Sequence, residues 1–488
     1  MKKLANLVGF DKEKTTVKTE ILAGIVTFLA MAYILTLNPL LLLNMFNGSE
    51  SAHLYSSVFV ATALGGFLGT LLMAIYAKLP LAQAPGLGLN SMVGGLLGGS
   101  LIGFSLSFGS SMLLVLFSGI LFLLLSILKI HGLSIREIIY RAIPESIRRA
   151  ISVGIGLFIA IIGLANAGIV TTGDGTVIGM VKFSSWDMSV LGPAHVCLLG
   201  FFVIAVLSHF NVKGAVIIGI LVSTLFGMIP AVGVTQWSGE TWKFWEHFQG
   251  FFSFDTATGG TFFAAFTEGF NFPAGVPIMS LVMVVITFCM VDMFDTMGTC
   301  VGCCSAAGLM TEDGLPLNYN KIMMADSIAT AAGSLLGTST VTTFVESGAG
   351  ISAGGRTGLT ALTTAILFLL SIFFLPLFAS IPGAAASSAL VWVGCLMMKG
   401  VKDVKVDSIK DLVPSFLTIA MMPFGYSITT GIGLGILSYV IISVFDYVVN
   451  LIAYKLGKKE VKPVWDLHIV MLIIAALFIV YFFVPLSF

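Results

Sequence analysis

The chain has 488 residues, of which 57% are hydrophobic and only 10% are charged, and its mean hydropathy is +1.04. Soluble globular proteins carry a charged share of roughly a quarter, so this composition excludes a soluble fold and indicates an integral membrane protein. The formal net charge is zero, which gives no reason to expect a nucleic-acid partner.

Apolar runs recur along the whole chain, and we expect an all-α polytopic membrane protein with fourteen transmembrane segments. A helix crosses the hydrocarbon core of a bilayer with roughly 20 residues. The first seven predicted segments are 20–44, 56–78, 86–103, 109–129, 145–166, 194–210 and 213–231. The second seven are 278–309, 321–338, 345–355, 358–380, 384–400, 412–424 and 427–449.

The positions of Lys and Arg support counting the short segments as crossings. With the N-terminus inside, every Lys and Arg except Lys182 and Lys243 falls on the inner side, where short loops retain basic residues. We therefore expect a multi-pass protein of the plasma (inner) membrane with a cytoplasmic N-terminus. The apolar run 467–484 is either a fifteenth crossing or an interfacial helix, and the sequence leaves both open.

The two halves of the chain contain related sequences. "ATALGGFLGT" (61–70) and "ATAAGSLLGT" (329–338) agree at most positions, and seven crossings separate them, so the second copy is inverted. Inverted repeats are typical of secondary transporters, with the substrate site between the copies. We expect a first repeat at 1–231, an extracytoplasmic loop at 232–277, a second repeat at 278–449 and a C-terminal segment at 450–488.

The third segment of each half is interrupted. "LPLAQAPGLGLN" in the first half carries proline and glycines, and "GTSTVTTFVESGAG" in the second is strand-like until Glu346 opens a Gly/Ala-rich half-helix. Irregular backbone at membrane depth is tolerated only inside protein or along a cavity. Matching interruptions point to a binding site, so we expect short strands and the substrate site here. A pair of loops just outside the membrane is the alternative.

Four of the carboxylates in the predicted spans belong to the eighth, ninth and tenth spans. Asp292, Asp295 and Thr296 stand at i, i+3 and i+4 on one helix face, and Asp326 and Glu346 lie in later spans. A carboxylate at the bilayer centre costs about 3 kcal/mol even on a lenient scale, so these groups must face protein or water. We expect Asp292 and Glu346 to be functional, whereas Asp295 and Asp326 either couple protons or brace a broken helix.

In this span assignment no intramembrane Lys or Arg pairs with these acids, and Arg356 falls in an inner loop. The lack of a basic partner favours a cation or a neutral solute with N–H donors over an inorganic anion. Asn90 offers both a donor and an acceptor, as recognition of a heterocycle edge requires. The sequence carries no catalytic motif, metal-ligand spacing or cofactor motif, so neither an enzyme nor a metal site is expected. A channel is disfavoured because the polar groups cluster at one depth.

At these residues the chain resembles nucleobase:cation symporter family 2, the xanthine/uracil permease superfamily, in its azaguanine-resistance-like branch of adenine and hypoxanthine/guanine permeases. The matching strings are "TEILAGIVTFLAMAYILTLNP", "QAPGLGLN", "DMFDTMGTCVG", "ADSIATAAGSLLGTSTVTTFVESGAGISAGGRTGLTA" and "PSFLTIAMMPFGYSITTGIGLGILSYV". They extend from about Thr19 to Val440. The outer loop 231–277 looks longer and more aromatic than is usual in that family.

The resemblance implies a core domain of spans 1–4 and 8–11, a gate domain of spans 5–7 and 12–14, and frequently a homodimer. It also implies proton-coupled purine uptake, with hypoxanthine or guanine our first choice and adenine our second. Another nucleobase such as xanthine or uracil, or an anion, is the alternative substrate.

The site residues carried over from the resemblance are Asn90, Asp292 and Glu346. Thr296 stands where the uracil-type branch has a histidine, and it is a further substrate-binding candidate. Phe344 is a candidate for stacking on the base.

Overall fold

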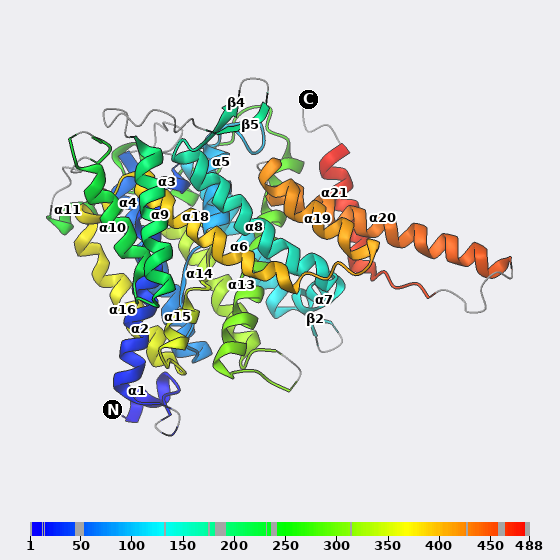
Figure 1. The fold of residues 1–488 in the computed structure, drawn as a ribbon, viewed down its shortest axis with the longest axis horizontal. Helices are drawn as coiled ribbons and strands as arrows, with labels where there is room; N and C mark the ends of the chain where they lie inside the picture. Colours follow the sequence, from blue (N-terminus) through cyan, green and yellow to red (C-terminus); the bar gives the residue numbers. More distant parts are fainter. Residues whose placement is uncertain are drawn as a thin grey trace. The chain divides into compact units, whose positions relative to one another are not determined.

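A computed structural model describes residues 2–11, 13, 15–43, 53–130, 133–173, 176–180, 192–230, 232–235, 242–312, 315–425, 428–456 and 464–483. The described chain is mostly helical, with three short antiparallel strand pairs (Figure 1). It divides into two compact units. The first contains Met1–Leu124, Ile159–Val276 and Val284–Val393, and the second contains Leu125–Phe158, Pro277–Met283 and Gly394–Phe488.

The first half of the chain contains the elements from α1 to α10. In chain order they are α1 (Lys2–Leu7), α2 (Val17–Met31), α3 (Ile34–Leu42), α4 (Tyr55–Leu72), β1 (Gln83–Pro85), α5 (Leu87–Leu97), α6 (Phe108–Ile127), β2 (Lys129–Ile130), β3 (Leu133–Ser134), α7 (Ile135–Ala142), α8 (Glu145–Asn166), β4 (Val170–Gly173), β5 (Thr176–Met180), α9 (Pro193–His209) and α10 (Ala215–Gly227).

The second half contains the elements from α11 to α21. They are α11 (Phe244–Phe251), α12 (Ala264–Thr267), α13 (Ile278–Ala307), α14 (Tyr319–Leu336), β6 (Val341–Thr343), α15 (Ser347–Ser352), α16 (Gly358–Ser371), α17 (Leu375–Ala379), α18 (Gly383–Met397), α19 (Ile409–Phe424), α20 (Ile428–Lys455) and α21 (Ile469–Phe483).

Eight helical stretches within the described residues are long and apolar enough to cross a membrane. They are Val17–Leu42, Tyr55–Ala77, Phe108–Ile127, Glu145–Asn166, Ile278–Ser305, Gly358–Ala379, Gly383–Asp403 and Thr430–Lys455. Shorter apolar helices include α5, α9 and α10. The protein is therefore a multi-pass membrane protein.

The first predicted segment is not one continuous helix. α2 ends at Met31 and α3 begins at Ile34, and the bonds from Leu35 N to Ala32 O and from Thr36 N to Tyr33 O tighten the backbone between them. Pro39 in α3 has no N–H, and its ring crowds the preceding turn. This local change of helix geometry occurs at Tyr33, a residue that the sequence analysis did not select.

β1 and β6 lie in the two interrupted segments and pair with each other in antiparallel register. Ala84 faces Thr342, Gln83 faces Thr343 and Pro85 faces Val341. Two flanking bonds extend the pairing, from Gly86 N to Thr340 O at 2.9 Å and from Phe344 N to Ala82 O at 3.0 Å. Both strands are fully buried. Each strand therefore supplies hydrogen-bond partners for backbone N–H and C=O groups of the other that would otherwise be unpaired.

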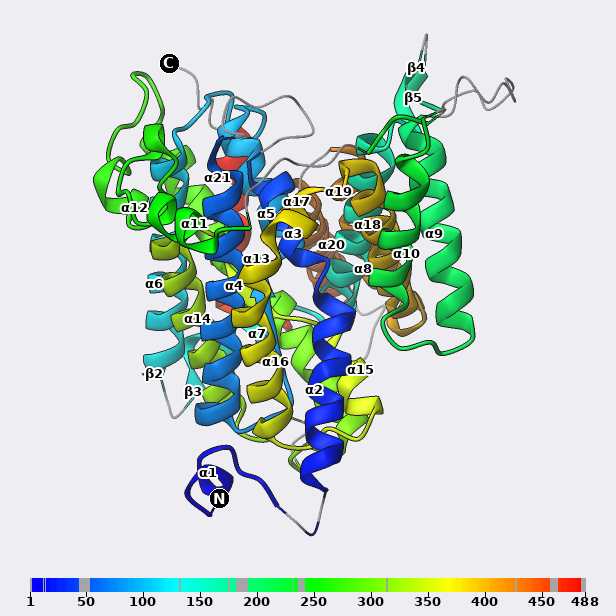
Figure 2. The same cartoon turned by 90° about the vertical axis from the view of Figure 1, so that its left-hand side faces the viewer.

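Glu20 joins α2 to the N-terminal end of α16. Its buried carboxylate accepts the backbone N–H groups of Arg356, Thr357 and Thr360 at 2.9, 3.3 and 3.1 Å. It also accepts the Thr360 hydroxyl at 2.6 Å. Figure 2 shows α2 beside α16, with α15 at the end of α2 nearer the N-terminus. The guanidinium of Arg356 donates back to Ile351 O at 2.7 Å and so ties down the end of α15.

The predicted extracytoplasmic loop contains α11 and α12, and a phenylalanine cluster packs between them. Phe251 and Phe262 have ring centroids 5.5 Å apart, and Phe262 and Phe263 meet edge to face at 4.5 Å. Trp242 and Trp245 are exposed. Residues 231 and 236–241 of this loop, and Lys182 further upstream, lie outside the described residues.

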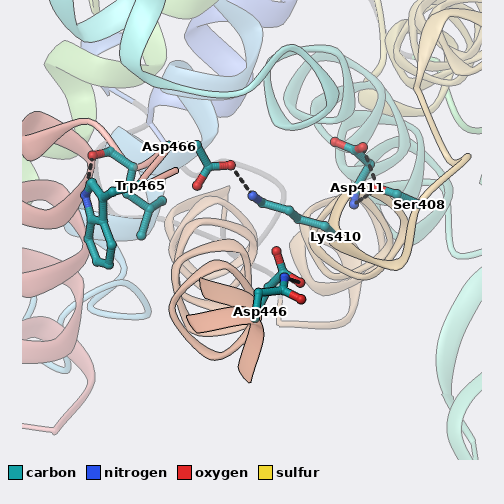
Figure 3. A network of polar contacts seen from close by, with 8 residues as sticks. Ser408, Lys410, Asp411, Asp446, Trp465 and Asp466 are labelled. Carbon is teal, nitrogen blue, oxygen red and sulfur yellow. Dashed lines mark hydrogen bonds and ion pairs between the residues drawn. The ribbon is translucent and has the colours of Figure 1, made fainter. Parts of the chain in front are cut away.

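The second unit contains α7, α19, α20, α21 and the first part of α8. Lys410 of α19 forms an ion pair with Asp466, and the Ser408 hydroxyl donates to Asp411 at 2.7 Å (Figure 3). α21 packs against α20 and α7, and it falls in the apolar run 467–484. Whether α21 crosses the bilayer stays open, and the division into core and gate domains stays a prediction.

We predict that Glu20→Ala lowers the free energy of unfolding by about 3 kcal/mol, because it leaves buried N–H donors without an acceptor. The thermal unfolding midpoint of the detergent-purified protein is the measurement. Glu13→Ala, at an exposed position, is the matched control and should leave the midpoint unchanged. Equal midpoints for the two variants would contradict the role given to Glu20.

Candidate functional site

The pairing of β1 with β6 gathers the predicted site residues within the first unit. Asn90 lies on α5 just after β1, and Phe344 and Glu346 follow β6 directly. α13 contributes Asp292, Asp295 and Thr296, and α14 contributes Asp326. Hydrogen bonds connect several of these residues to the strands or to each other. The residues differ in how many of their side-chain polar atoms have a hydrogen-bond partner.

Glu346 is the residue that precedes α15, and it is only partly buried. The Tyr33 hydroxyl donates to Glu346 Oε1 at 2.5 Å. Tyr33 itself is buried at the junction of α2 and α3. Asp295 on α13 is also partly buried, and the structure gives its side chain no hydrogen bond within the described residues. These two carboxyls therefore form the accessible side of the acidic cluster.

Asp292 and Asn90 are both fully buried, and each keeps one polar atom unused. The Thr330 hydroxyl donates to Asp292 Oδ2 at 2.7 Å, but Asp292 Oδ1 has no hydrogen-bond partner in the described structure. The Ser339 hydroxyl donates to Asn90 Oδ1, and Asn90 Nδ2 has no partner there either. An unpaired buried polar group costs about 1–3 kcal/mol, so one acceptor at Asp292 and one donor at Asn90 are unsatisfied in the described structure.

Asp326 is fully engaged by its neighbours. Gln83 Nε2 donates to one carboxylate oxygen at 2.6 Å, and the Thr296 hydroxyl donates to the other at 2.8 Å. Thr296 also lies 2.6 Å from the Thr342 hydroxyl of β6. These bonds connect α13 and α14 to both strands, so Asp326 and Thr296 brace the strand pair in this structure.

Phe344 is buried, with 6% of its surface exposed. Its backbone N–H donates to Ala82 O as part of the strand pairing. Phe344 precedes Glu346 by two residues in the chain. The backbone thus fixes Phe344 close to the accessible carboxyl, as a stacking residue requires. Its contact with a base stays a prediction.

Basic partners do not compensate the acidic cluster. Within the described ranges, none of Asp292, Asp295, Asp326 and Glu346 forms an ion pair with Lys or Arg, and no group of three His, Cys, Asp or Glu side chains is placed to hold a metal ion. Hydroxyl and amide groups donate instead to Glu346, Asp326 and one oxygen of Asp292. Such a site offers acceptors to a neutral solute and little attraction to an anion.

Several residues that hydrogen-bond to the predicted site residues escaped the sequence analysis, among them Tyr33, Gln83, Thr330 and Ser339. Gln83 opens the string "QAPGLGLN", and Thr330 lies within the repeated string 329–338. Thr62, its counterpart in the first copy, accepts a hydrogen bond from Asn38 at 2.5 Å. Equivalent threonines therefore bind a polar side chain of the preceding segment in both copies, a role that their shared place in the repeat could have indicated.

We predict that Asp326→Ala destabilises the protein by roughly 2–3 kcal/mol, because Gln83 Nε2 and the Thr296 hydroxyl lose a buried charged acceptor. Asp326→Asn should lose less than half as much, because Gln83 Oε1 is unpaired and a rotated amide pair can restore a bond. Thermal unfolding of both purified variants measures this. A smaller loss for Ala than for Asn would refute the bracing role.

Comparison with known proteins places this arrangement in a family. A guanine/hypoxanthine permease, PbuO, of Bacillus subtilis (strain 168) is 35% identical over 97% of this chain and 99% of its own length. An adenine permease, AdeQ, of Escherichia coli (strain K12) is 35% identical over 90% of each chain.

The fold is also similar to that of a solved structure. The transmembrane domain of the cyanobacterial bicarbonate transporter BicA superposes with a TM-score of 0.56 at 16% identity, covering 86% of this chain and 97% of that one. This likeness concerns the fold alone. The profile of the Xan_ur_permease family, described as a permease family, matches residues 18–434. The chain belongs to this permease family.

Proposed function

We infer that this protein is a secondary active transporter that takes up purine nucleobases together with protons, with hypoxanthine or guanine preferred and adenine second. The observation that carries the proposal is the acidic cluster, which has no basic partner in the part of the chain that the structure describes. There, Asp292 Oδ1 is an unpaired acceptor and Asn90 Nδ2 an unpaired donor. The names of the two bacterial relatives, a guanine/hypoxanthine permease and an adenine permease, agree with it.

The free atoms match the edge of an oxopurine. Hypoxanthine and guanine carry an N1–H donor beside the C6 carbonyl, so a carboxylate accepts from the ring and a carboxamide donates to the oxygen. Adenine has the reverse pattern at these positions, with a ring acceptor beside an amino donor. A carboxylate and a carboxamide also meet the adenine edge when the base is turned over, so we propose hypoxanthine or guanine first and adenine second as substrates of the same two residues.

Glu346 is the group that the base meets first, because it is the more accessible carboxyl. The Tyr33 hydroxyl donates to one of its oxygens, and an N–H of the base shares or replaces that bond. Phe344 stacks on the ring. Asp295 is the accessible carboxyl left to exchange protons with water, whereas Asp326 remains in its bracing contacts.

The transport cycle follows from the predicted architecture. Fourteen crossings form a seven-plus-seven inverted repeat, and the core domain moves against the gate domain to expose the site alternately to each side. The N-terminus is cytoplasmic, the protein lies in the plasma (inner) membrane, and it assembles as a homodimer. An anion substrate is disfavoured because the cluster has no basic partner among the residues described by the structure.

We predict that Glu346→Gln reduces hypoxanthine uptake about 100-fold or more, because it removes the charged acceptor and makes half of the carboxyl a donor. The measurement is initial uptake of radiolabelled hypoxanthine in a purine-uptake-deficient bacterium, with Glu13→Gln as the matched control. A protonophore should abolish uptake by the parent, and unlabelled guanine should compete better than uracil. Parental uptake by Glu346→Gln would defeat the proposal.

We also predict that Tyr33→Phe slows uptake roughly ten-fold, since a hydrogen bond to a charged group contributes about 1.5–3 kcal/mol. Initial rates over a range of hypoxanthine concentrations in proteoliposomes measure the effect. Tyr76→Phe is the control, because Tyr76 is exposed and its hydroxyl contacts only the sulfur of Met324 among its described hydrogen bonds. If both variants transport alike, Tyr33 has no part in handling the substrate.

A further inference from the structure

A cavity of about 450 Å³ lies within the first unit, between α2, α15 and the connection from α9 to α10. Val26 and Ala30 of α2 line one wall, and Ala349 and Ser352 of α15 line the next. Ligand pockets in proteins commonly enclose roughly 300–1,000 Å³. The cavity is therefore large enough for a small organic solute.

The helical register connects this cavity to the proposed site. Tyr33 follows Ala30 by three residues and Glu346 precedes Ala349 by three, and residues at this spacing share a helix face one turn apart. The backbone at Tyr33 and Glu346 is right-handed helical. Tyr33 lies in the tightened turn between α2 and α3, where residues three apart lie one above the other. The hydrogen bond between Tyr33 and Glu346 thus lies one turn beyond the cavity walls.

α15 has one packed face and one open face. A Cβ added at Gly350 would overlap the Thr27 hydroxyl and approach Ala23 O to 2.7 Å, so no solute can pass there. A Cβ added at Gly348 would meet nothing within 4 Å, and Ser352 on the cavity side is exposed. The face of α15 at Gly350 is therefore closed by α2, whereas Ala349 and Ser352 border the cavity.

The cavity extends toward the end of the unit that holds the N-terminus. Ala353 lines it, and a Cβ at the next residue, Gly354, would lie 2.6 Å from Thr19 near the start of α2. Across the cavity, Asn211 and Lys213 of the α9–α10 connection are exposed. The apolar lining residues Val26, Ala30 and Ala349 thus lie toward the site, and the exposed polar residues Asn211 and Lys213 lie across the cavity from them.

We propose that this cavity is the passage by which the base moves between Glu346 and the N-terminal side of the membrane, and that Ala30 and Ala349 set its width. The inference rests on the proposed function, since it assumes that a small solute binds at Glu346. The inference adds the route by which the base is released. It gives Ala30 and Ala349, which line the cavity, a role separate from the binding of the base.

Leucine at either alanine tests the passage. Ala30→Leu and Ala349→Leu should bind radiolabelled hypoxanthine in detergent within about three-fold of the parent, but should exchange it across proteoliposomes at least about ten-fold more slowly, because overpacking closes a fixed route. Ala476→Leu, on the exposed side of α21, is the matched control and should transport normally. Parental exchange rates in both variants would overturn the proposal.

Chemical accessibility gives an independent readout. In a Cys395→Ser background, which removes the exposed native cysteine, a membrane-impermeant thiol reagent should modify Ala349→Cys from the N-terminal side, and saturating hypoxanthine should slow the reaction. Absence of modification, or modification unaffected by hypoxanthine, would show that the cavity is not the route. If the parent itself neither binds nor transports hypoxanthine, the proposed function fails, which is a separate result.

Discussion

Backbone groups inside a bilayer must find hydrogen-bond partners within the protein, and this constraint organises the centre of the first unit. Two segments far apart in the chain each give up helical bonds, and β1 and β6 restore them by pairing with each other. The pairing places the starts of α5 and α15 next to the strands. Asn90 and Glu346 consequently stand on short helical segments that are held by the same ladder.

The buried acids divide into groups with different tasks, and their hydrogen bonds decide which task each can perform. Both carboxylate oxygens of Asp326 accept hydrogen bonds, from Gln83 and Thr296, and so stabilise the strand pair. One oxygen of Asp292 accepts a hydrogen bond, and the other has no partner in the described structure. Glu346 and Asp295 lie on the accessible side. Burying a carboxylate within a membrane protein costs free energy. A ligand that donates a hydrogen bond to the unpaired oxygen of Asp292 can offset part of that free energy.

Much of this arrangement could be predicted from the sequence because it follows from composition and periodicity. Apolar runs located the helices, and glycine and proline beside strand-forming residues located the two interrupted segments. The acids were identified because charge within a span is costly wherever it points. Composition, periodicity and charge are each properties of a single segment of the chain.

The contacts between segments could not be predicted, because periodicity says nothing of which partner a side chain reaches. Tyr33 is an ordinary aromatic residue in an apolar run, and only the change of helix geometry before Pro39 and the nearness of α15 bring it to Glu346. The hydrogen bonds between Glu20 and the start of α16 likewise join two segments that are far apart in the sequence. Cavities formed by three elements are invisible to sequence patterns for the same reason.

The most direct measurement is a cryo-electron microscopy map of the purified protein with hypoxanthine, compared with a map recorded without it. The account predicts added density for one base within hydrogen-bond distance of the Glu346 carboxyl, beside Phe344 and close to the paired strands. Density for the base at any other place in the protein, with nothing added at Glu346, would contradict it.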